Sequence, residues 1–245
     1  GMRIGLQLYT VRGLMDHDLA GTIAEVARIG YREVELAGLH GKTAKEMRVI
    51  VDRAGLTVPS SHISMQDVRG DWSRTLDDAA TLGQTYIVCP WIDEPDRTVD
   101  GYTRVAHELT RAGEASRARG IQLAYHNHDY EFTPVGGRLP YDILLAESDP
   151  SLVQLELDIF WIVKGGQDPL AYFARFPGRF PLVHAKDMTK DGTMVDVGSG
   201  SIDWRAIFAH SKQAGVQHTF VEHDEPASPI AETKASYEYL RALRF

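Results

Sequence analysis

One stretch of ten residues limits the possible folds of this chain more than any other part of the sequence. Residues 152–161 read LVQLELDIFW, and aliphatic side chains alternate with polar ones over positions 153–158. Alternate side chains of a β-strand point to opposite faces, so Glu156 and Asp158 share one polar face near the end of the stretch. A strand of a (β/α)₈ barrel has this pattern, with its polar end at the mouth where such barrels keep their functional sites. A half-solvated surface strand is the alternative.

Strand and helix patterns alternate along the whole chain. Alternation predicts eight strands, at residues 3–9, 31–36, 57–64, 85–91, 121–128, 152–161, 180–186 and 217–223. Helical spacing predicts eight helices, at residues 16–29, 43–54, 72–82, 99–119, 139–147, 168–176, 202–214 and 231–243. This series predicts one α/β domain over residues 1–245, a (β/α)₈ TIM barrel. A doubly wound open sheet is the alternative, but it would carry a glycine-rich phosphate loop after its first strand, which this sequence lacks.

The composition argues against several classes of protein. A formal net charge of −8 disfavours nucleic acid and other polyanions as partners. No apolar run approaches the roughly 20 residues of a membrane helix, and no signal peptide opens the chain, so we expect a cytoplasmic protein without a membrane partner. Cys89 is the only cysteine, which excludes an internal disulfide and a thiolate-rich zinc site, and we expect it to be a buried strand residue.

Polar side chains gather near the C-terminal ends of the predicted strands. They are Gln7, Glu35, His62, His126, His128, Glu156, Asp158, His184, Lys186 and Glu222. A packed barrel interior normally holds aliphatic side chains, so charges at the ends of so many strands indicate a functional site. Taken singly, each residue has a structural explanation: Glu35 as a solvated strand acid, for example, or His62 as a core histidine.

Three of these residues suggest a metal site. Asp158, His184 and Glu222 would converge from three successive strands, and two carboxylates with one imidazole favour Mn²⁺, Mg²⁺ or Co²⁺, with Zn²⁺ as an alternative. Such ions need further ligands. The segment around the fifth strand offers three candidates for a fourth ligand: His126, His128 and Glu131.

Four segments resemble those of one enzyme superfamily. They are HNHDYEF at 126–132, ELD at 156–158, HAKD at 184–187 and GSGSIDW at 198–204. Together with the strand order, they resemble the xylose-isomerase-like (β/α)₈ superfamily, and within it the sugar phosphate isomerase/epimerase group that includes tagatose epimerases and inosose dehydratases. The resemblance covers nearly the whole chain. It specifies the fold better than the substrate, because the group hosts epimerases, isomerases, dehydratases, keto-glycoside-cleaving enzymes and an endonuclease branch.

The resemblance implies a set of metal ligands. The family's Glu, Asp, His and Glu ligands correspond here to Glu131, Asp158, His184 and Glu222. The epimerases carry the first glutamate inside the fifth strand, where this chain has Tyr125 and His126. Glu131 would therefore have to reach back from the loop, and His126 is the alternative ligand. Trp161 stands where the epimerases have a histidine that binds sugar hydroxyls.

The resemblance also implies a chemistry. A divalent metal, with Mn²⁺ favoured, polarises the carbonyl of a bound sugar and stabilises an enediolate after proton removal. A base and an acid complete an isomerisation, an epimerisation or an elimination. Glu222 is the expected base, and the further acid/base candidates are His62, His126, His128 and Lys186. The residues expected to contact the sugar are Gln7, Glu35, Trp91, Glu156 and Trp161.

We therefore expect a metal-dependent isomerase or epimerase that acts on a sugar or keto-sugar. A lyase, a dehydratase or a keto-glycoside-cleaving enzyme on the same metal site is the first alternative. An abasic-site endonuclease is a weaker one, because it would need more metal ligands and a basic groove for phosphates. A sugar-binding barrel without catalysis fits less well, because it would not need the whole set of carboxylates and histidines. The sequence is compatible with a homo-oligomer.

Overall fold

The structure, a computed structural model that describes residues 2–245, has eight parallel strands closed into a barrel. The barrel strands are β1 (Ile4–Gln7), β2 (Glu33–Ala37), β3 (Thr57–His62), β4 (Tyr86–Cys89), β5 (Gln122–His126), β6 (Val153–Asp158), β7 (Leu182–Ala185) and β10 (His218–Val221). Hydrogen bonds join them in the order β1-β10-β7-β6-β5-β4-β3-β2, and β2 closes on β1. The predicted (β/α)₈ barrel is confirmed, and the open doubly wound sheet is excluded.

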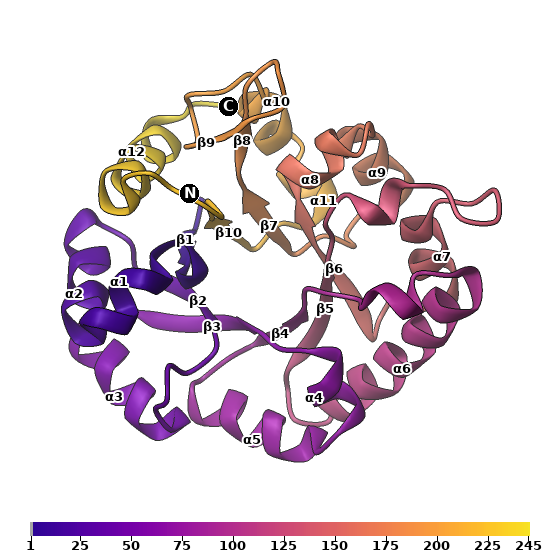
Figure 1. Ribbon diagram of the computed structural model, residues 1–245, viewed down its shortest axis with the longest axis horizontal. Coiled ribbons are helices and arrows are strands. Elements are labelled where there is room, and N and C mark those ends of the chain that lie inside the picture. Colours follow the sequence, from indigo (N-terminus) through magenta and orange to yellow (C-terminus); the bar gives the residue numbers. More distant parts are fainter. Residues whose placement is uncertain (1) are drawn as a thin grey trace.

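Helices surround the barrel as an outer ring (Figure 1). They are α1 (Arg12–His17), α2 (Leu19–Ile29), α3 (Ala44–Arg53), α4 (Met65–Arg69), α5 (Trp72–Thr81), α6 (Val99–Arg117), α7 (Pro140–Glu147), α8 (Ile159–Lys164), α9 (Pro169–Arg175), α10 (Trp204–Ala209), α11 (Ser211–Ala214) and α12 (Pro229–Ala242). The connections contain the 3₁₀ helices η1 (Leu8–Val11), η2 (Glu94–Asp96) and η3 (Tyr130–Phe132), and a ribbon of β8 (Asp187–Met188) and β9 (Met194–Val195). No helix within residues 2–245 has both the length and the apolar character needed to cross a membrane.

The strand predicted at residues 152–161 is shorter in the structure. β6 ends at Asp158, and the residues that follow form helix α8. The Asp158 side chain accepts a hydrogen bond from the backbone N–H of Trp161 at 3.0 Å, which caps the helix. The residue that ends the strand therefore also begins the helix.

Other differences from the predicted elements lie in the connections. β4 and β5 each end two residues before their predicted ends. The helix predicted at residues 202–214 is divided into α10 and α11 at His210, whose Nδ1 lies 2.7 Å from the backbone oxygen of Ala206. Cys89 is buried at the end of β4, as predicted, and burial raises the pKa of its thiol to about 12.

An apolar plug fills the barrel below its C-terminal mouth. Val88, Ala124, Leu182 and Phe220 are fully buried and pack together there. Gly5 leaves room for the Phe220 ring, because a Cβ at position 5 would lie 2.6 Å from it. Residues two positions further along a strand face the same way, and in β5, β7 and β10 those residues are polar. The plug is therefore the floor of a polar layer.

Candidate active site

The polar residues predicted at the strand ends meet at the C-terminal mouth of the barrel. A cavity of about 550 Å³ opens there. Its lining includes the predicted residues His62, Trp91, His126, His128, Lys186 and Glu222. A larger cavity of about 770 Å³ lies at the N-terminal end of the barrel, and none of the predicted site residues lines it. The smaller cavity is the candidate active site, because (β/α)₈ enzymes carry their sites at the C-terminal face.

Four side chains beside this cavity form what we call the mouth group: His126, Asp158, His184 and Glu222. One nitrogen or oxygen atom of each lies within 4.8 Å of the others. His126 Nε2 is 2.9 Å from Asp158 Oδ2, and His184 Nδ1 is 3.2 Å from Glu222 Oε1. All four residues are at most 6% exposed. Two carboxylates and two imidazoles are donors that first-row divalent cations accept, so the group fits one metal ion.

Lys186 lies against the mouth group and is only 1% exposed. Its Nζ is 2.8 Å from Asp158 Oδ2, 2.5 Å from Glu222 Oε1 and 3.2 Å from Asp224 Oδ1. Burial opposes ionisation of Asp158 and Glu222, but the Lys186 ammonium and neighbouring imidazoles outweigh it and hold the pKa of both carboxyls below the usual range. Asp224 was not predicted as a site residue from the sequence. Its position two residues after Glu222, which on a strand would give it the same face, was the available signal.

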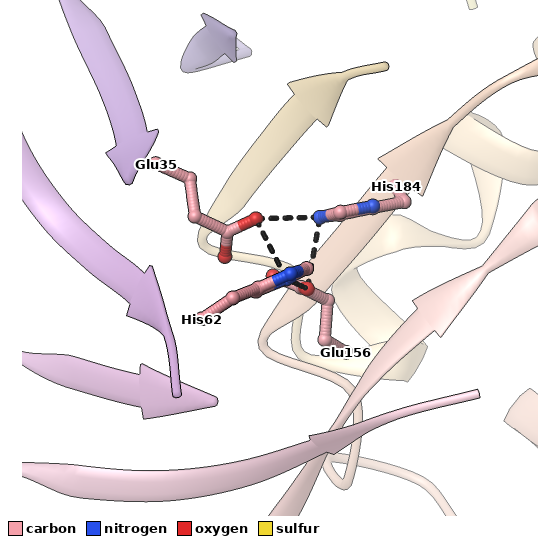
Figure 2. A group of neighbouring side chains, drawn as sticks. All are labelled: Glu35, His62, Glu156 and His184. Atoms are coloured by element: carbon pink, nitrogen blue, oxygen red, sulfur yellow. Dashed lines mark hydrogen bonds and ion pairs between the residues drawn. The ribbon is translucent and has the colours of Figure 1, made fainter. Parts of the chain in front are cut away.

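A second set of side chains lies deeper in the barrel, and we call it the deep group: Glu35, His62, Glu156 and His184. The four side chains point toward one another (Figure 2). His184 Nε2 is 2.6 Å from Glu35 Oε1 and 2.8 Å from Glu156 Oε1. His62 Nε2 is 2.7 Å from Glu156 Oε1 and 3.1 Å from Glu35 Oε1. The two groups share His184, whose Nδ1 faces the mouth group and whose Nε2 faces the deep group.

Gln7, Glu35 and Glu156, which we expected to contact a sugar, lie in the deep group or directly beside it. All three are 0% exposed, and none of them lines the cavity, because they lie one side-chain layer below it. Gln7 Nε2 donates a hydrogen bond to Glu35 Oε1 at 2.9 Å, and the Ser60 hydroxyl donates to Glu35 Oε2 at 2.7 Å. Burial opposes the charged form of His62, but Glu35 and Glu156 outweigh it and raise the His62 pKa to about 10.

Glu131 does not join the mouth group, contrary to the ligand set that the resemblance implies. Its Oε2 accepts a hydrogen bond from the Tyr125 hydroxyl at 2.5 Å, and its Oε1 accepts one from the backbone N–H of His128 at 3.0 Å. The 3₁₀ turn η3 holds Glu131 in a buried position beside Tyr125. His126, the alternative ligand, lies in the mouth group instead.

Asn127 also shapes the mouth, although the sequence pattern gave it no role. Its Oδ1 accepts a hydrogen bond from the backbone N–H of Asp158 at 2.9 Å, and its Nδ2 lies 3.3 Å from the Asp158 backbone oxygen. These two bonds fix the backbone at the junction of β6 and α8. The signal available in the sequence was the position of Asn127 between two site histidines.

The glycine-rich segment at 198–204 is hydrogen-bonded to the buried side chain of Asp187. Its carboxylate accepts hydrogen bonds from the backbone N–H groups of Gly198 at 2.9 Å, Gly200 at 3.2 Å and Ile202 at 3.2 Å. It also accepts one from the indole N–H of Trp204 at 2.9 Å. These backbone N–H groups of the loop are therefore already hydrogen-bonded to Asp187 within the protein.

Aromatic side chains form part of the wall of the cavity. Trp91 is 46% exposed, and its ring meets the His128 ring edge-on with 5.0 Å between centroids. Trp161 is not among the residues that line the cavity, and its ring centre lies 5.7 Å from Lys186 Nζ. Burial and the nearby Lys186 ammonium lower the pKa of His128 to about 4, so this imidazole is neutral at pH 7.

Comparisons with known proteins agree with this fold. An inosose dehydratase from Lacticaseibacillus casei is 24% identical over an alignment of 263 positions, which covers 90% of this chain and 88% of that protein. A sugar phosphate isomerase/epimerase from Parabacteroides distasonis ATCC 8503 superposes with a TM-score of 0.88 at 27% identity, covering 99% of this chain and 94% of the other. The IOLI protein, solved with a bound zinc atom, shares the fold with a TM-score of 0.76 at 15% identity, over 97% of this chain and 96% of the other. The family model for the xylose isomerase-like TIM barrel matches residues 23–243, and the chain belongs to that family.

Proposed function

We propose that this protein is a divalent-metal-dependent isomerase or epimerase of a sugar or keto-sugar, and that it works by removing a proton next to a carbonyl group. The observation that carries the proposal is the buried mouth group beside a cavity of about 550 Å³. There, one bound substrate would contact the metal ion held by its ligands, a carboxylate base and a buried ammonium group. Small polar molecules are the substrates that such a cavity suits.

The mouth group would hold the metal. His126, Asp158, His184 and Glu222 supply two imidazole nitrogens and two carboxylates, a set that suits Mn²⁺, Co²⁺ or Zn²⁺ better than Mg²⁺. Of these we favour Mn²⁺. When bound, the cation supplies Lewis-acid polarisation of the substrate oxygens.

Glu222 is the proposed base. Its contacts with Lys186 and His184 both use Oε1, which leaves Oε2 for the substrate proton. The Lys186 ammonium stands beside it as an acid or as a partner for a developing negative charge. His128 lines the same cavity as a neutral imidazole and is a second group that can carry a proton.

The walls of the cavity would orient the sugar. Trp91, which lines the cavity, offers an aromatic face to the apolar face of a sugar ring. His62 reaches the floor of the cavity from the deep group, with 12% of its side chain exposed. The substrate would therefore be held between an aromatic wall and a polar floor.

A panel of sugars, keto-sugars and inososes tests the proposal, with the masses of substrate and product compared. An isomerase or epimerase gives a product of unchanged mass and a new configuration or carbonyl position. Activity should disappear in the Glu222→Gln variant, and it should depend on the metal content of the wild type. Full turnover of a panel substrate by the fully chelated enzyme would contradict the proposal.

A dehydratase is the second candidate function. Inosose dehydratases of several organisms match most of this chain at 22–25% identity, which favours elimination of water after the same proton removal. The Lys186 ammonium would then protonate the departing hydroxyl. A product lighter by one water would select the dehydratase over the isomerase.

A further inference from the structure

We propose that the deep group is a second divalent-cation site, below the mouth group and separate from the single ion that the proposed function needs. Its ligands would be Glu35 from β2, His62 from β3, Glu156 from β6 and His184 from β7. In the barrel, β2 lies next to β3 and β6 lies next to β7, but the two pairs are not adjacent to each other. The four side chains therefore converge across the barrel interior, as Figure 2 shows.

The donor atoms have the arrangement of a four-coordinate site. Two imidazole nitrogens and two carboxylate oxygens alternate in a closed ring of contacts, at 2.6, 2.8, 2.7 and 3.1 Å. Around a tetrahedral Zn²⁺ with bonds of about 2.1 Å, neighbouring ligand atoms are about 3.4 Å apart. An ion at the centre of the ring would move each donor outward by only a few tenths of an ångström, because all four already face it.

The orientation of Glu35 supports a ligand role. Gln7 holds its Oε1 at 2.9 Å and Ser60 holds its Oε2 at 2.7 Å, so the carboxylate is fixed with Oε1 toward both imidazoles. Outer hydrogen bonds of this kind orient the carboxylate ligands of metal sites. Gln7 and Ser60 are both 0% exposed, so no solvent competes for these bonds.

Glu156 gives an independent indication. Its Oε2 is buried and has no hydrogen-bond partner among residues 2–245, while its Oε1 faces both imidazoles. A buried carboxylate oxygen without a partner is costly and rare in proteins. A cation bound through Oε1 would neutralise the charge that the two oxygens of Glu156 share, whereas hydrogen bonds from the two imidazoles to Oε1 leave Oε2 without a partner.

The charge of the deep group matches one divalent ion. When both carboxylates are ionised and both imidazoles are neutral, one divalent cation brings the deep group to zero net charge. Protons on both imidazoles give the same balance, so the metal content separates the two states. His184 would bridge the deep and mouth ions through its two ring nitrogens, and it would give up both N–H protons when both sites are filled.

Metal counting tests the proposal. Protein stripped with a chelator and reloaded with excess Zn²⁺ should hold two tightly bound ions per chain by elemental analysis. The Glu35→Gln and His62→Ala variants should each hold one. Glu131→Gln is the matched control, since it alters a buried carboxyl outside both groups, and it should still hold two. Circular dichroism of each variant establishes that it is folded, and His62→Ala is the milder change because His62 reaches the cavity floor.

Asp158→Asn separates this proposal from the proposed function. If both sites exist, Asp158→Asn should also fall to one ion, and the double variant with Glu35→Gln should hold none. A wild type with one ion that Asp158→Asn loses and Glu35→Gln keeps would overturn the deep site and leave the proposed function standing. One ion lost only in Glu35→Gln and His62→Ala would support the deep site and contradict the mouth site.

Cobalt gives a readout that does not depend on activity. Co²⁺ in a four-coordinate N₂O₂ site absorbs visible light more strongly than Co²⁺ with bound waters. Because the mouth group offers the same N₂O₂ donors, the comparison is made in Asp158→Asn, where the intense band should be present, and in the double variant with Glu35→Gln, where it should be absent. An unchanged spectrum in the double variant would overturn the assignment.

Discussion

At the scale of single residues, Lys186 controls the charge of the mouth. Its ammonium lies within 3.2 Å of three carboxylate oxygens, with only 1% of the residue exposed. Two of these carboxylates, Asp158 and Glu222, are the same ones that would bind a metal. The ammonium and a divalent cation therefore compete for the same negative charge.

Lys186→Met removes this competitor while keeping most of the side-chain volume. We expect the variant to bind metal about tenfold more tightly, because the two carboxylates lose a neutralising partner. We expect turnover to fall by about 10²–10⁴, as for loss of a general acid. Chelator competition and steady-state kinetics measure the two effects, and Lys164→Met, on the outer helix α8, is the control. Unchanged turnover would remove Lys186 from the mechanism.

The buried Glu131 predicts a specific pH dependence of stability. Burial, partly offset by the Tyr125 hydroxyl, raises its pKa from 4.5 to about 7. Between these pH values the folded state binds this proton more tightly than the unfolded state, so stability falls as the pH rises, by up to about 3 kcal/mol. Glutamine keeps the neutral form, so Glu131→Gln should lose this contribution. Urea unfolding from pH 4.5 to 8 measures it, and parallel curves for the two proteins would contradict it.

At the scale of elements, strand alternation predicted most of what the site needed. His126, His184 and Glu222 lie at the mouth because alternation is a local property of a strand and survives folding. Strand alternation could not place Glu131, which only the family resemblance named as a ligand, because its direction depends on the turn η3 after the end of β5. Helix α8 was missed because Asp158 changes role from strand residue to helix cap, and a six-residue helix is too short to reveal its periodicity.

The close packing of β1 on the apolar plug predicts that alanine substitutions at two glycines change the stability of the fold in opposite directions. Gly5→Ala would set a Cβ 2.6 Å from the Phe220 ring, which has no room to move, and should destabilise the fold by about 1–3 kcal/mol. Gly13→Ala in α1 meets nothing within 4 Å and should stabilise it by up to about 1 kcal/mol. Denaturant unfolding compares them, and equal stabilities would show that the plug is loosely packed.

At the scale of the whole molecule, an apolar plug in the barrel separates the polar residues at the C-terminal mouth from the N-terminal end. The apolar plug lies below the deep group, on the side of the larger cavity at the N-terminal end. Each residue of the mouth group lies in, or directly after, a different strand, and the closed hydrogen-bonded ring fixes the distances between those strands. Side chains far apart in the sequence, such as Glu35 and His184 at a separation of 149 positions, thereby meet within hydrogen-bonding distance.

The proposed proton abstraction predicts an isotope effect on the reaction. Substrate deuterated next to its carbonyl should react several-fold more slowly where removal of that hydrogen limits the rate, and Glu222→Gln should abolish turnover even with metal bound. Turnover in D₂O should also introduce deuterium at that carbon when the base exchanges with solvent. A base shielded by the buried mouth would return the same proton, so the kinetic isotope effect is the decisive measurement. Label recovered intact on the neighbouring carbon would indicate a hydride shift, which contradicts Glu222 as the base and leaves the metal site untouched.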